Sequence, residues 1–430
     1  MSKNTRQRIQ TSAPRVHVQG DETIKIALIG CGGRGTGAAC QALSTEGPVK
    51  LWAMADIFQE RIDSSLLGLQ QGLESRYDRE ESTGFADRVD VPPERQFVGF
   101  DAYKRAIDSG VDLAILTTFP HFRPEQYEYA VRQSVNVFQE KPLAVDAPGV
   151  RRLLAADVIA KEKGLKVGVG LQRRHNPVYQ EVMARIHDGA IGRPQLIQCY
   201  WNGSTNSALA PREEGMSEME FQLRNRYMFT WLCGDHNVEQ HIHNIDVCNW
   251  IMEDYPVKAN GMGGRQYRNG REHGEIFDHH YVEYAYPDGT IMYSQCRQMP
   301  DCWNRVAETV QGLEGVAELS QRLSTIQNAA GEWKTSRVVA NPYQIEHDDL
   351  FAAIRNNTPY NETDYGARST MTAIMGRMAT YSGKVVTLDE AMASDLTLAP
   401  ETYAMDAQPP IVPDENGEYP CAMPGTTKGL

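Results

Sequence analysis

The sequence has no apolar run that approaches the ~20 residues a helix needs to cross a bilayer, which argues against a membrane-spanning protein. It also has no surplus of positive charge, because 43 Lys and Arg residues face 56 Asp and Glu residues, for a formal net charge of −13 at pH 7. Phosphate backbones and anionic lipid surfaces repel a chain this acidic. We therefore expect neither a nucleic-acid partner nor a membrane partner.

The eight cysteines lack the spacing of a redox or metal motif. They stand at positions 31, 40, 199, 233, 248, 296, 302 and 421, with no Cys-x-x-Cys pair. Reduced thiols of this kind are typical of the cytoplasm. The first 20 residues are polar and contain no apolar core, so they do not read as a secretory signal. We expect a cytoplasmic protein, and an export signal removed from a longer precursor would reverse that expectation.

A glycine-rich turn between two apolar runs stands near the start of the chain. Residues 24–29 form a run of strand length, and residues 30–35, Gly-Cys-Gly-Gly-Arg-Gly, fit the pattern G-x-G-x-x-G. Residues 36–43 are predicted to form a helix, and residues 49–55 a second strand. Strand, glycine turn, helix and strand in this order are typical of a dinucleotide-binding unit.

Each glycine of this turn has its own physical role. Gly30 permits the tight turn, Gly32 lets the backbone approach a pyrophosphate, and Gly35 lets the helix pack closely on the strand. The start of the helix, with Gly33 and Arg34, offers free N–H groups and the positive end of a helix dipole to the phosphates. We predict a dinucleotide site here, against the alternative of a purely structural turn.

Asp56 indicates which dinucleotide binds. It ends the second strand about 20 residues after the last glycine, where a ribose-binding acid is expected. Its carboxylate can accept hydrogen bonds from both ribose hydroxyls of NAD but would repel the 2′-phosphate of NADP. Ile57 and Phe58 offer no cation to hold that phosphate. The predicted cofactor is therefore NAD, with NADP less favoured.

Strands and helices alternate as far as residue 171, which predicts a parallel, doubly wound sheet over residues 23–171. The charged segment 75–93 interrupts the pattern and reads as a surface insertion. The later strands are expected at 111–118, 135–139 and 166–171, with helices at 123–133 and 150–163.

Beyond residue 172 the pattern changes to a largely antiparallel sheet with helices. The turn Pro-Asp-Gly at 287–289 lies between two alternating runs and predicts a hairpin. Strands are expected at 195–200, 257–261, 277–286 and 290–297, and helices at 178–188, 236–252, 345–356 and 367–381. The predicted organisation is an N-terminal arm (1–22), a first domain (23–171), a second domain (172–400) and an extended tail (401–430).

Three polar residues follow predicted strands of the first sheet. Thr118 ends one strand, and Glu140-Lys141-Pro142 follows another. Because ligands of open parallel sheets bind beyond the carboxyl ends of the strands, Thr118, Glu140 and Lys141 are predicted at the cofactor cleft. Lys141 could hydrogen-bond a substrate hydroxyl and stabilise the alkoxide that develops as hydride leaves. An ordinary surface lysine is the alternative.

A second group of reactive residues lies at 234–246. Glu239 and His243 are four apart and would share one face of the predicted helix. A histidine beside a carboxylate suits a general base that removes a hydroxyl proton. His236 lies on the same face and is predicted to bind substrate. A metal held by His236, Glu239 and His243 and a solvent-facing polar surface are the alternatives.

Two further polar clusters are open to more than one interpretation. Arg173, Arg174 and His175 follow the last strand of the first sheet and are predicted to bind substrate hydroxyls. Their alternative role is to pair with the surplus acids. Residues 278–280, Asp-His-His, could offer metal ligands, but they begin a strand that is expected to place its two imidazoles on opposite faces. We predict no bound metal.

The motifs together resemble those of the glucose–fructose oxidoreductase / inositol dehydrogenase (Gfo/Idh/MocA) family. The matching marks are the glycine turn, Glu140-Lys141-Pro142, Asn176-Pro177, Gly189-Ala190-Ile191-Gly192 and His243-Asn244-Ile245-Asp246. The resemblance covers about residues 23–390. It implies an N-terminal Rossmann domain with a doubly wound parallel sheet and a C-terminal α/β domain with a large, mostly antiparallel open sheet.

The resemblance also implies a homo-oligomer, a dimer or a tetramer, that acts on a sugar or cyclitol hydroxyl. Carried over, the family's catalytic lysine, acid and histidine are Lys141, Glu239 and His243, although the family's usual aspartate is a glutamate here. The expected activity is an NAD-dependent oxidation of a secondary alcohol. Some relatives instead cleave glycosides by oxidation, elimination and reduction, which remains an alternative, and a metal-dependent enzyme that is no dehydrogenase is a less favoured one.

Overall fold

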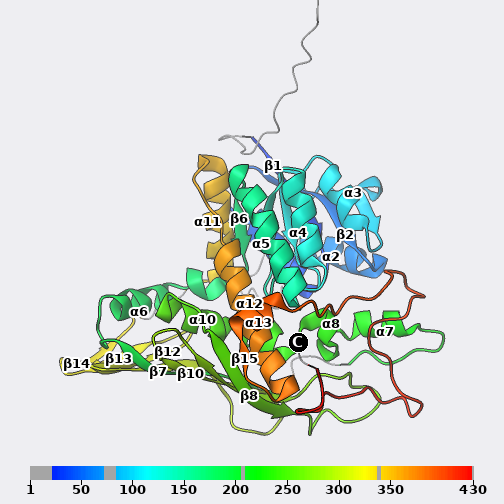
Figure 1. The fold of residues 1–430 in the computed structure, drawn as a ribbon. Coiled ribbons are helices and arrows are strands. Elements are labelled where there is room, and N and C mark those ends of the chain that lie inside the picture. Colours follow the sequence, from blue (N-terminus) through cyan, green and yellow to red (C-terminus); the bar gives the residue numbers. More distant parts are fainter. Residues whose placement is uncertain (1–21, 72–83, 205–208, 337–339, 429–430) are drawn as a thin grey trace, which may run out of the picture.

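The computed structural model describes residues 22–71, 84–204, 209–336 and 340–428 (Figure 1). The predicted N-terminal arm, apart from its last residue, and residues 75–83 of the predicted insertion at 75–93 lie outside the described residues. The described residues form a six-stranded and a nine-stranded sheet. None of the described helices is long and apolar enough to cross a membrane.

The first sheet is parallel throughout, with strand order β3-β2-β1-β4-β5-β6. Helices cover both of its faces, so its central strands are buried on both sides, as the run Leu-Ala-Ile-Leu of β4 requires. The strands are β1 (Ile24–Ile29), β2 (Val49–Asp56), β3 (Gln96–Val98), β4 (Leu113–Leu116), β5 (Asn136–Gln139) and β6 (Val167–Val169). The helices are α1 (Gly33–Leu43), α2 (Gln59–Gln71), α3 (Ala102–Asp108), α4 (Arg123–Arg132) and α5 (Ala147–Glu162), with short 3₁₀ turns η1 (Ala86–Arg88), η2 (Pro93–Arg95) and η3 (Gln172–His175).

The second sheet has the order β14-β13-β12-β11-β7-β10-β9-β8-β15, and only its β7–β10 pair is parallel among the described strands. The predicted α/β class, a parallel sheet followed by a mostly antiparallel one, is therefore confirmed. The strands are β7 (Pro194–Gly203), β8 (Lys258–Gly264), β9 (His279–Ala285), β10 (Ile291–Gln298), β11 (Arg305–Gly312), β12 (Gly315–Leu319), β13 (Thr325–Asn328), β14 (Gly331–Lys334) and β15 (Val386–Thr387).

The predicted single helix over 236–252 is wrong. The structure has α9 (His236–Glu239) and α10 (Ile242–Met252), separated at Gln240 and His241. At this break the buried ring of His241 lies 2.7 Å from the hydroxyl of Ser294 in β10. The break separates Glu239 from His243, two of the three predicted catalytic residues.

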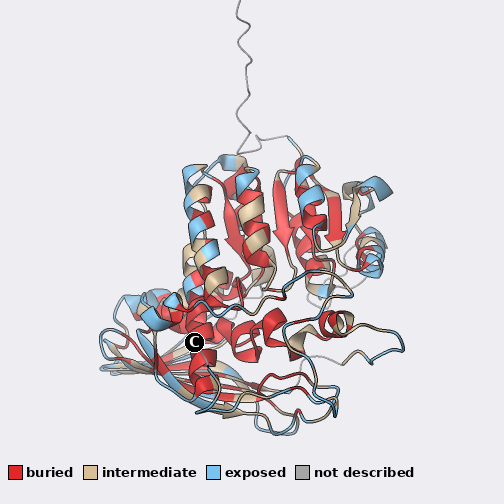
Figure 2. Cartoon of the chain, turned by 45° about the vertical axis from the view of Figure 1, so that its right-hand side comes forward, coloured by how far each residue is buried: buried red, intermediate tan, exposed pale blue. Residues whose placement is uncertain are grey.

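Two long helices from late in the chain return toward the first sheet. Helix α11 (Pro342–Asn356) buries Leu350, Phe351 and Ile354 in the same apolar cluster as strands β1 and β2. Helix α12 (Thr363–Ser382) is buried along most of its length and packs against α5 and β8. Figure 1 shows α11 beside β6, and Figure 2 shows how densely buried residues fill the zone between the two sheets. Helices α6 (Pro177–His187) and α13 (Leu388–Ala393) complete the second part.

A third apolar cluster joins the first sheet, the segment 209–232 and the tail. Phe58 follows β2, Trp231 belongs to the segment, and Tyr419 belongs to the tail, and all three are buried in this cluster. The tail also contacts the first part directly, because the Tyr403 hydroxyl lies 2.7 Å from Nε2 of His121. The segment contains α7 (Glu218–Arg224), η4 (Arg226–Met228) and α8 (Thr230–Cys233). It thus lies against the carboxyl ends of the first sheet.

Candidate active site

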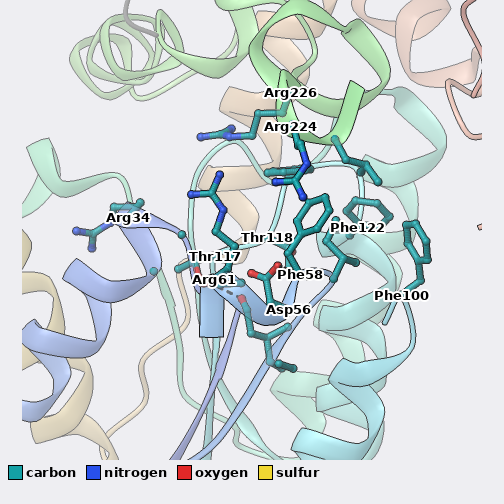
Figure 3. Close-up of a pocket in the computed structure, with 18 of the residues that line it drawn as sticks. Arg34, Asp56, Phe58, Arg61, Phe100, Thr117, Thr118, Phe122, Arg224 and Arg226 are labelled. Atoms are coloured by element: carbon teal, nitrogen blue, oxygen red, sulfur yellow. Dashed lines mark hydrogen bonds between the residues drawn. The ribbon is translucent and has the colours of Figure 1, made fainter. Parts of the chain in front are cut away.

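A cavity of about 260 Å³ opens at the carboxyl ends of β1, β2 and β4, where the strand order of the first sheet reverses. Open parallel sheets bind ligands at this point. Figure 3 shows side chains from the first sheet and from segment 209–228 pointing into the cavity. The predicted cofactor residues that line it are Gly30, Gly32, Gly33, Arg34, Gly35, Asp56 and Thr118.

The glycines of the turn divide into two kinds. Gly30 has φ of +95°, and a Cβ there would lie 2.6 Å from the backbone nitrogen of Thr118. A Cβ on Gly35 would collide with the carbonyl oxygen of Gly30. By contrast, a Cβ on Gly32 or Gly33 would meet nothing within 4 Å. Gly30 and Gly35 are therefore required by the fold, whereas Gly32 and Gly33 leave open a cradle of the kind that a pyrophosphate fills.

Asp56 is tied to the glycine turn. Its Oδ2 accepts a hydrogen bond of 2.7 Å from the backbone N–H of Cys31, and its Oδ1 accepts one of 3.0 Å from that of Phe58. Burial raises the pKa of Asp56 above its usual value, and these two N–H groups oppose the rise. The carboxylate is thus held in one orientation at the wall of the cavity, where it can accept ribose hydroxyls.

Segment 209–228 covers the cavity with residues that the sequence analysis did not assign to a site. Arg224 and Arg226 line the cavity from this segment, and Arg61 lines it from α2, near Asp56 (Figure 3). Arg224 pairs with Glu60 at 2.9 Å and lies over the ring of Phe58. Ile57 and Phe58 carry no charge, but Arg61, about one helical turn further on, is a cation at the cavity. Nothing in the local sequence pattern signals Arg224 or Arg226.

Arg34 and Glu140 connect the cavity to the predicted catalytic lysine. Nε of Arg34 donates a hydrogen bond of 2.5 Å to Oε1 of Glu140. The other oxygen of Glu140 accepts one of 3.2 Å from the backbone N–H of Lys141. Glu140 itself is buried, so its predicted contact with the cofactor would run through Arg34. Thr118 donates to Gln126 through its hydroxyl at 2.6 Å.

Lys141 and Glu239 meet between the two sheets. Nζ of Lys141 donates a hydrogen bond of 2.5 Å to the backbone oxygen of Glu239 and lies 3.7 Å from its Oε1. The same Oε1 lies 3.2 Å from Nη1 of Arg226, which lines the cavity. Burial lowers the pKa of Lys141, and the two nearby glutamates oppose that change. Arg123, also missed from the sequence, holds this loop by donating to the carbonyl oxygens of Thr118 and Pro142.

His243 lies close to the lysine but not in contact with Glu239. Its ring stacks on Trp201 with 5.9 Å between ring centroids, and 7% of the residue is exposed. Burial lowers the pKa of His243 well below its usual value, and Lys141 and Arg173 lower it further. Among the described residues no hydrogen bond joins Glu239 to His243, because α9 ends before His243. The predicted shared helical face is therefore wrong, and Glu239 pairs with cations instead.

The predicted substrate-binding cluster 173–175 pairs with acids. Nη1 of Arg173 lies 2.6 Å from Oε1 of Glu308. Arg173 also lies near enough to His243 to lower the pKa of that histidine, so it remains beside the site. Arg174 binds Asp246 with two hydrogen bonds of 2.9 Å. The pairing with acids, the alternative role, is thus present, and binding of substrate hydroxyls by these residues stays a prediction. The local sequence could not reveal these pairs, since the acids come from α10, β11, α11 and the residue before α12.

His175 joins three elements of the chain. Its Nδ1 lies 2.8 Å from Asp349 of α11, and its Nε2 lies 3.1 Å from Glu362, which precedes α12. Burial alone would lower the pKa of His175, but these two acids raise it to about 10. The imidazole is therefore charged at neutral pH and acts as a link between η3, α11 and α12.

His236, predicted to bind substrate, points into the second sheet. Its Nδ1 lies 2.8 Å from the sulfur of Cys296 in β10, and its residue is 2% exposed. Among the described residues His236, Glu239 and His243 do not form a group that could hold a metal. The alternative of a metal held by these three residues is therefore wrong. His279 and His280 do lie on opposite faces of β9, half-exposed and buried respectively.

Known proteins resemble this chain in sequence over most of their length. No protein-family model matches the chain. The inositol 2-dehydrogenase of Agrobacterium fabrum is 25% identical over 398 residues, which cover 89% of this chain and 99% of the relative. The inositol 2-dehydrogenase of Acidiphilium cryptum is 23% identical over 353 residues, which cover 79% of this chain and 89% of the relative.

Solved structures share the fold. The aldose-aldose oxidoreductase of Caulobacter crescentus matches with a TM-score of 0.65 at 17% identity, covering 85% of this chain and all of that chain. The scyllo-inositol dehydrogenase of Lactobacillus casei with bound NAD(H) and scyllo-inositol matches with a TM-score of 0.60 at 18% identity, covering 86% and 100%. These structures share the two-sheet α/β fold of this chain. Together with the near full-length relatives, they confirm its resemblance to the Gfo/Idh/MocA family.

The glycine cradle gives a first prediction. Gly32→Val should weaken NAD binding at least tenfold, because the new side chain enters the open cradle, and should leave the melting temperature nearly unchanged, because φ of −73° suits any residue. Titration calorimetry and thermal melting measure the two effects. Gly35→Ala is the matched control, expected to lower the melting temperature through its collision with Gly30. Unchanged NAD affinity in Gly32→Val would contradict the assignment of the cradle.

The link at His175 gives a second prediction. Its folded-state pKa of about 10 exceeds the ~6.5 of an unfolded histidine, so its stabilising effect is complete below pH 6.5 and disappears as the pH rises through 10. Relative to the wild type, His175→Gln should lose about 2 kcal/mol of unfolding free energy at pH 6 and much less at pH 10. Urea unfolding at both pH values measures this difference. The exposed His187→Gln is the control, and an equal loss at both pH values would refute the ionic link.

Proposed function

We propose that this protein is an NAD-dependent oxidoreductase that takes hydride from a secondary hydroxyl of a sugar, a sugar derivative or an inositol. The observation that carries the proposal is the meeting of Lys141 with Glu239 next to the glycine-lined cavity, linked to that cavity by Arg226. The relatives named inositol 2-dehydrogenase support the substrate class. A neighbour solved with NAD(H) and scyllo-inositol supports the cofactor.

The residues present suit NAD. The open cradle at Gly32 and Gly33 would receive the pyrophosphate, and Asp56 would accept the ribose hydroxyls. Arg34, Thr118 and Glu140 would border the same cleft, Glu140 acting through its contact with Arg34. Bound NAD would supply the hydride acceptor. The other roles in the reaction belong to side chains of this chain.

His243 and Lys141 divide the work on the hydroxyl group. A substrate hydroxyl bound between them would give its proton to His243, which burial keeps neutral and therefore able to accept it. The carbon-bound hydrogen leaves as hydride, and the product is a ketone. The ammonium group of Lys141 would stabilise the oxygen as negative charge develops on it. Glu239 would hold Lys141 and Arg226 in position rather than orient His243.

A redox-neutral glycoside-cleaving cycle is a second candidate, and one observation favours it. Segment 209–228 lines the same cavity as the glycine turn, and the tail packs on that segment from the outside. A dinucleotide covered in this way would leave slowly. Slow release suits an enzyme that oxidises a ring hydroxyl, eliminates the aglycone and then returns the hydride to its own product.

We also propose that the protein is a cytoplasmic homo-oligomer, a dimer or a tetramer, assembled through the second sheet. Met262, Tyr281, Gln295 and Tyr200 are cross-strand partners and form one row across β8, β9, β10 and β7. Cross-strand partners point to the same face. Met262 is 70% exposed and Tyr281 is 36% exposed. Figure 1 shows no labelled helix over this lower face, so a second copy could cover it.

A substrate panel tests the proposed function. Pure protein with NAD would be mixed with free sugars, inositols and aryl glycosides, and NADH formation and aglycone release would be followed together. Reduction of NAD without bond cleavage is the expected result and establishes the dehydrogenase. Cleavage that requires NAD but leaves no net NADH would instead establish the second candidate. If no substrate class gives NADH or released aglycone, both candidate functions are wrong.

Lys141→Ala tests the mechanism. Turnover should fall about 10²- to 10⁴-fold, the usual effect of an acid–base group, while the affinity for NAD changes little because the cradle is intact. Steady-state kinetics and NAD titration measure the two quantities. Lys104→Ala on the exposed face of α3 is the matched control and should match the wild type. Near-normal turnover of Lys141→Ala would remove this lysine from the mechanism.

A further inference from the structure

Three buried polar residues converge behind α9, on the side of the second sheet. Oδ1 of Asp235 lies 3.1 Å from Nε2 of His280 and 3.6 Å from Nε2 of His236. All three ligand atoms lie within 4.8 Å of one another, and each residue is at most 4% exposed. Around a tetrahedral ion with bonds of about 2.0–2.1 Å, ligand atoms are about 3.3–3.4 Å apart. The two measured separations lie on either side of that value.

Each of the two histidines has its other ring nitrogen engaged. Nδ1 of His280 lies 3.0 Å from the hydroxyl of Thr380, and that hydroxyl donates its hydrogen to the backbone oxygen of Arg377. Nδ1 of His236 lies 2.8 Å from the sulfur of Cys296, whose thiol donates to the backbone oxygen of His236. Thr380 and Cys296 therefore accept from the imidazoles, which places the ring hydrogen on Nδ1 and the lone pair on Nε2.

The carboxylate of Asp235 is oriented in a similar way. Its Oδ2 accepts hydrogen bonds from the backbone N–H of Phe277 and from the hydroxyl of Tyr381, at 3.1 and 2.5 Å. These contacts leave Oδ1 to face the two imidazoles. Groups that bind metals are commonly held by outer partners of this type, which fix their tautomer and direction.

This hydrogen bonding brings lone pairs of Nε2 of His236, Nε2 of His280 and Oδ1 of Asp235 together in a buried place. With both imidazoles protonated on Nδ1, two lone pairs and a carboxylate oxygen face one another without a hydrogen between them. Nε2 of His236 has no hydrogen-bond partner among the described residues. A buried polar atom without a partner costs roughly 1–3 kcal/mol. Protonation of His280 would satisfy its contact with Asp235 but would leave the nitrogen of His236 unpaired.

We propose that Asp235, His236 and His280 bind one divalent transition-metal ion, with zinc as the preferred ion. Two imidazoles and one carboxylate are a donor set that such ions favour. Arg268 is a cation beside the cluster; its guanidinium contacts Gln298, and the carboxylates of Asp235 and, more weakly, Asp278 attract it. This site differs from the set His236, Glu239 and His243, since it uses β9 in place of α10.

The ion would have a structural role. It would join the start of α9 to β9 in the sheet behind it, and α9 ends at Glu239, which holds Lys141. Asp235 has φ of +76°, and the ion would also stabilise that unusual backbone conformation. Because the site is buried and none of its three residues lines the cavity, the ion takes no part in the hydroxyl chemistry, and the inference stands apart from the proposed function.

Metal content tests the site without any activity measurement. Full-length protein would be treated with EDTA, incubated with zinc, desalted and measured by plasma mass spectrometry. We expect about one zinc per chain in the wild type and less than 0.2 in His280→Gln. His279→Gln is the matched control, because His279 is the neighbour on the exposed face of β9, and it should retain about one zinc. Less than 0.2 zinc in the wild type, or equal zinc in the two variants, would overturn the proposal.

A second measurement needs no variant. Cobalt(II) added to metal-free wild-type protein should give the visible absorption of a four-coordinate ion, and zinc should abolish that absorption at one equivalent. Zinc should also raise the melting temperature of the wild type by several degrees, because a ligand that binds only the folded state stabilises it. If cobalt gives only the weak spectrum of the hydrated ion and zinc leaves the melting temperature unchanged, the proposal is wrong.

Discussion

The contact between Lys141 and Glu239 is the constraint around which the site is built. Lys141 stands at the end of β5 in the first sheet, and Glu239 ends α9 on the second. Neither charge is stable in a buried zone alone, so each element must present its partner at the right depth. Arg226 shares the carboxylate of Glu239 and also lines the cavity. One carboxylate thus connects the two sheets and the cover of the cavity.

The sequence predicted the parts of the site that depend on local chain geometry. The glycine turn, Asp56 and Lys141 all follow strands of a parallel sheet, and the carboxyl ends of such strands meet at one edge whatever the rest of the chain does. The same pattern predicted the first sheet and its class. The positions of the glycine turn, Asp56 and Lys141 could therefore be predicted without reference to distant residues.

The parts that sequence reasoning missed depend on contacts between distant segments. The acids that pair with Arg173, Arg174 and His175 lie about 70 to 190 residues further along the chain, and no local pattern connects them. The helix expected over 236–252 satisfied the 3.6-residue period but is broken where His241 enters the core beside Ser294. Strands β12, β13 and β14 have only 5, 4 and 4 residues, so their pairing in the sheet, rather than their sequence, defines them.

The burial of the charges explains why the two sheets must be held so firmly. His243 is useful as a base only while it is neutral, and burial and the nearby charge of Lys141 both lower its affinity for protons. Burial also lowers the pKa of Lys141, and Glu239 opposes that change. Residues of segment 209–228 line the cavity on the same side. A small shift of α9 would therefore change the electrostatics of the lysine and the closure of the cavity together. That coupling makes the fixed position of α9, and whatever anchors its first turn, part of the chemistry even though no reacting atom lies there.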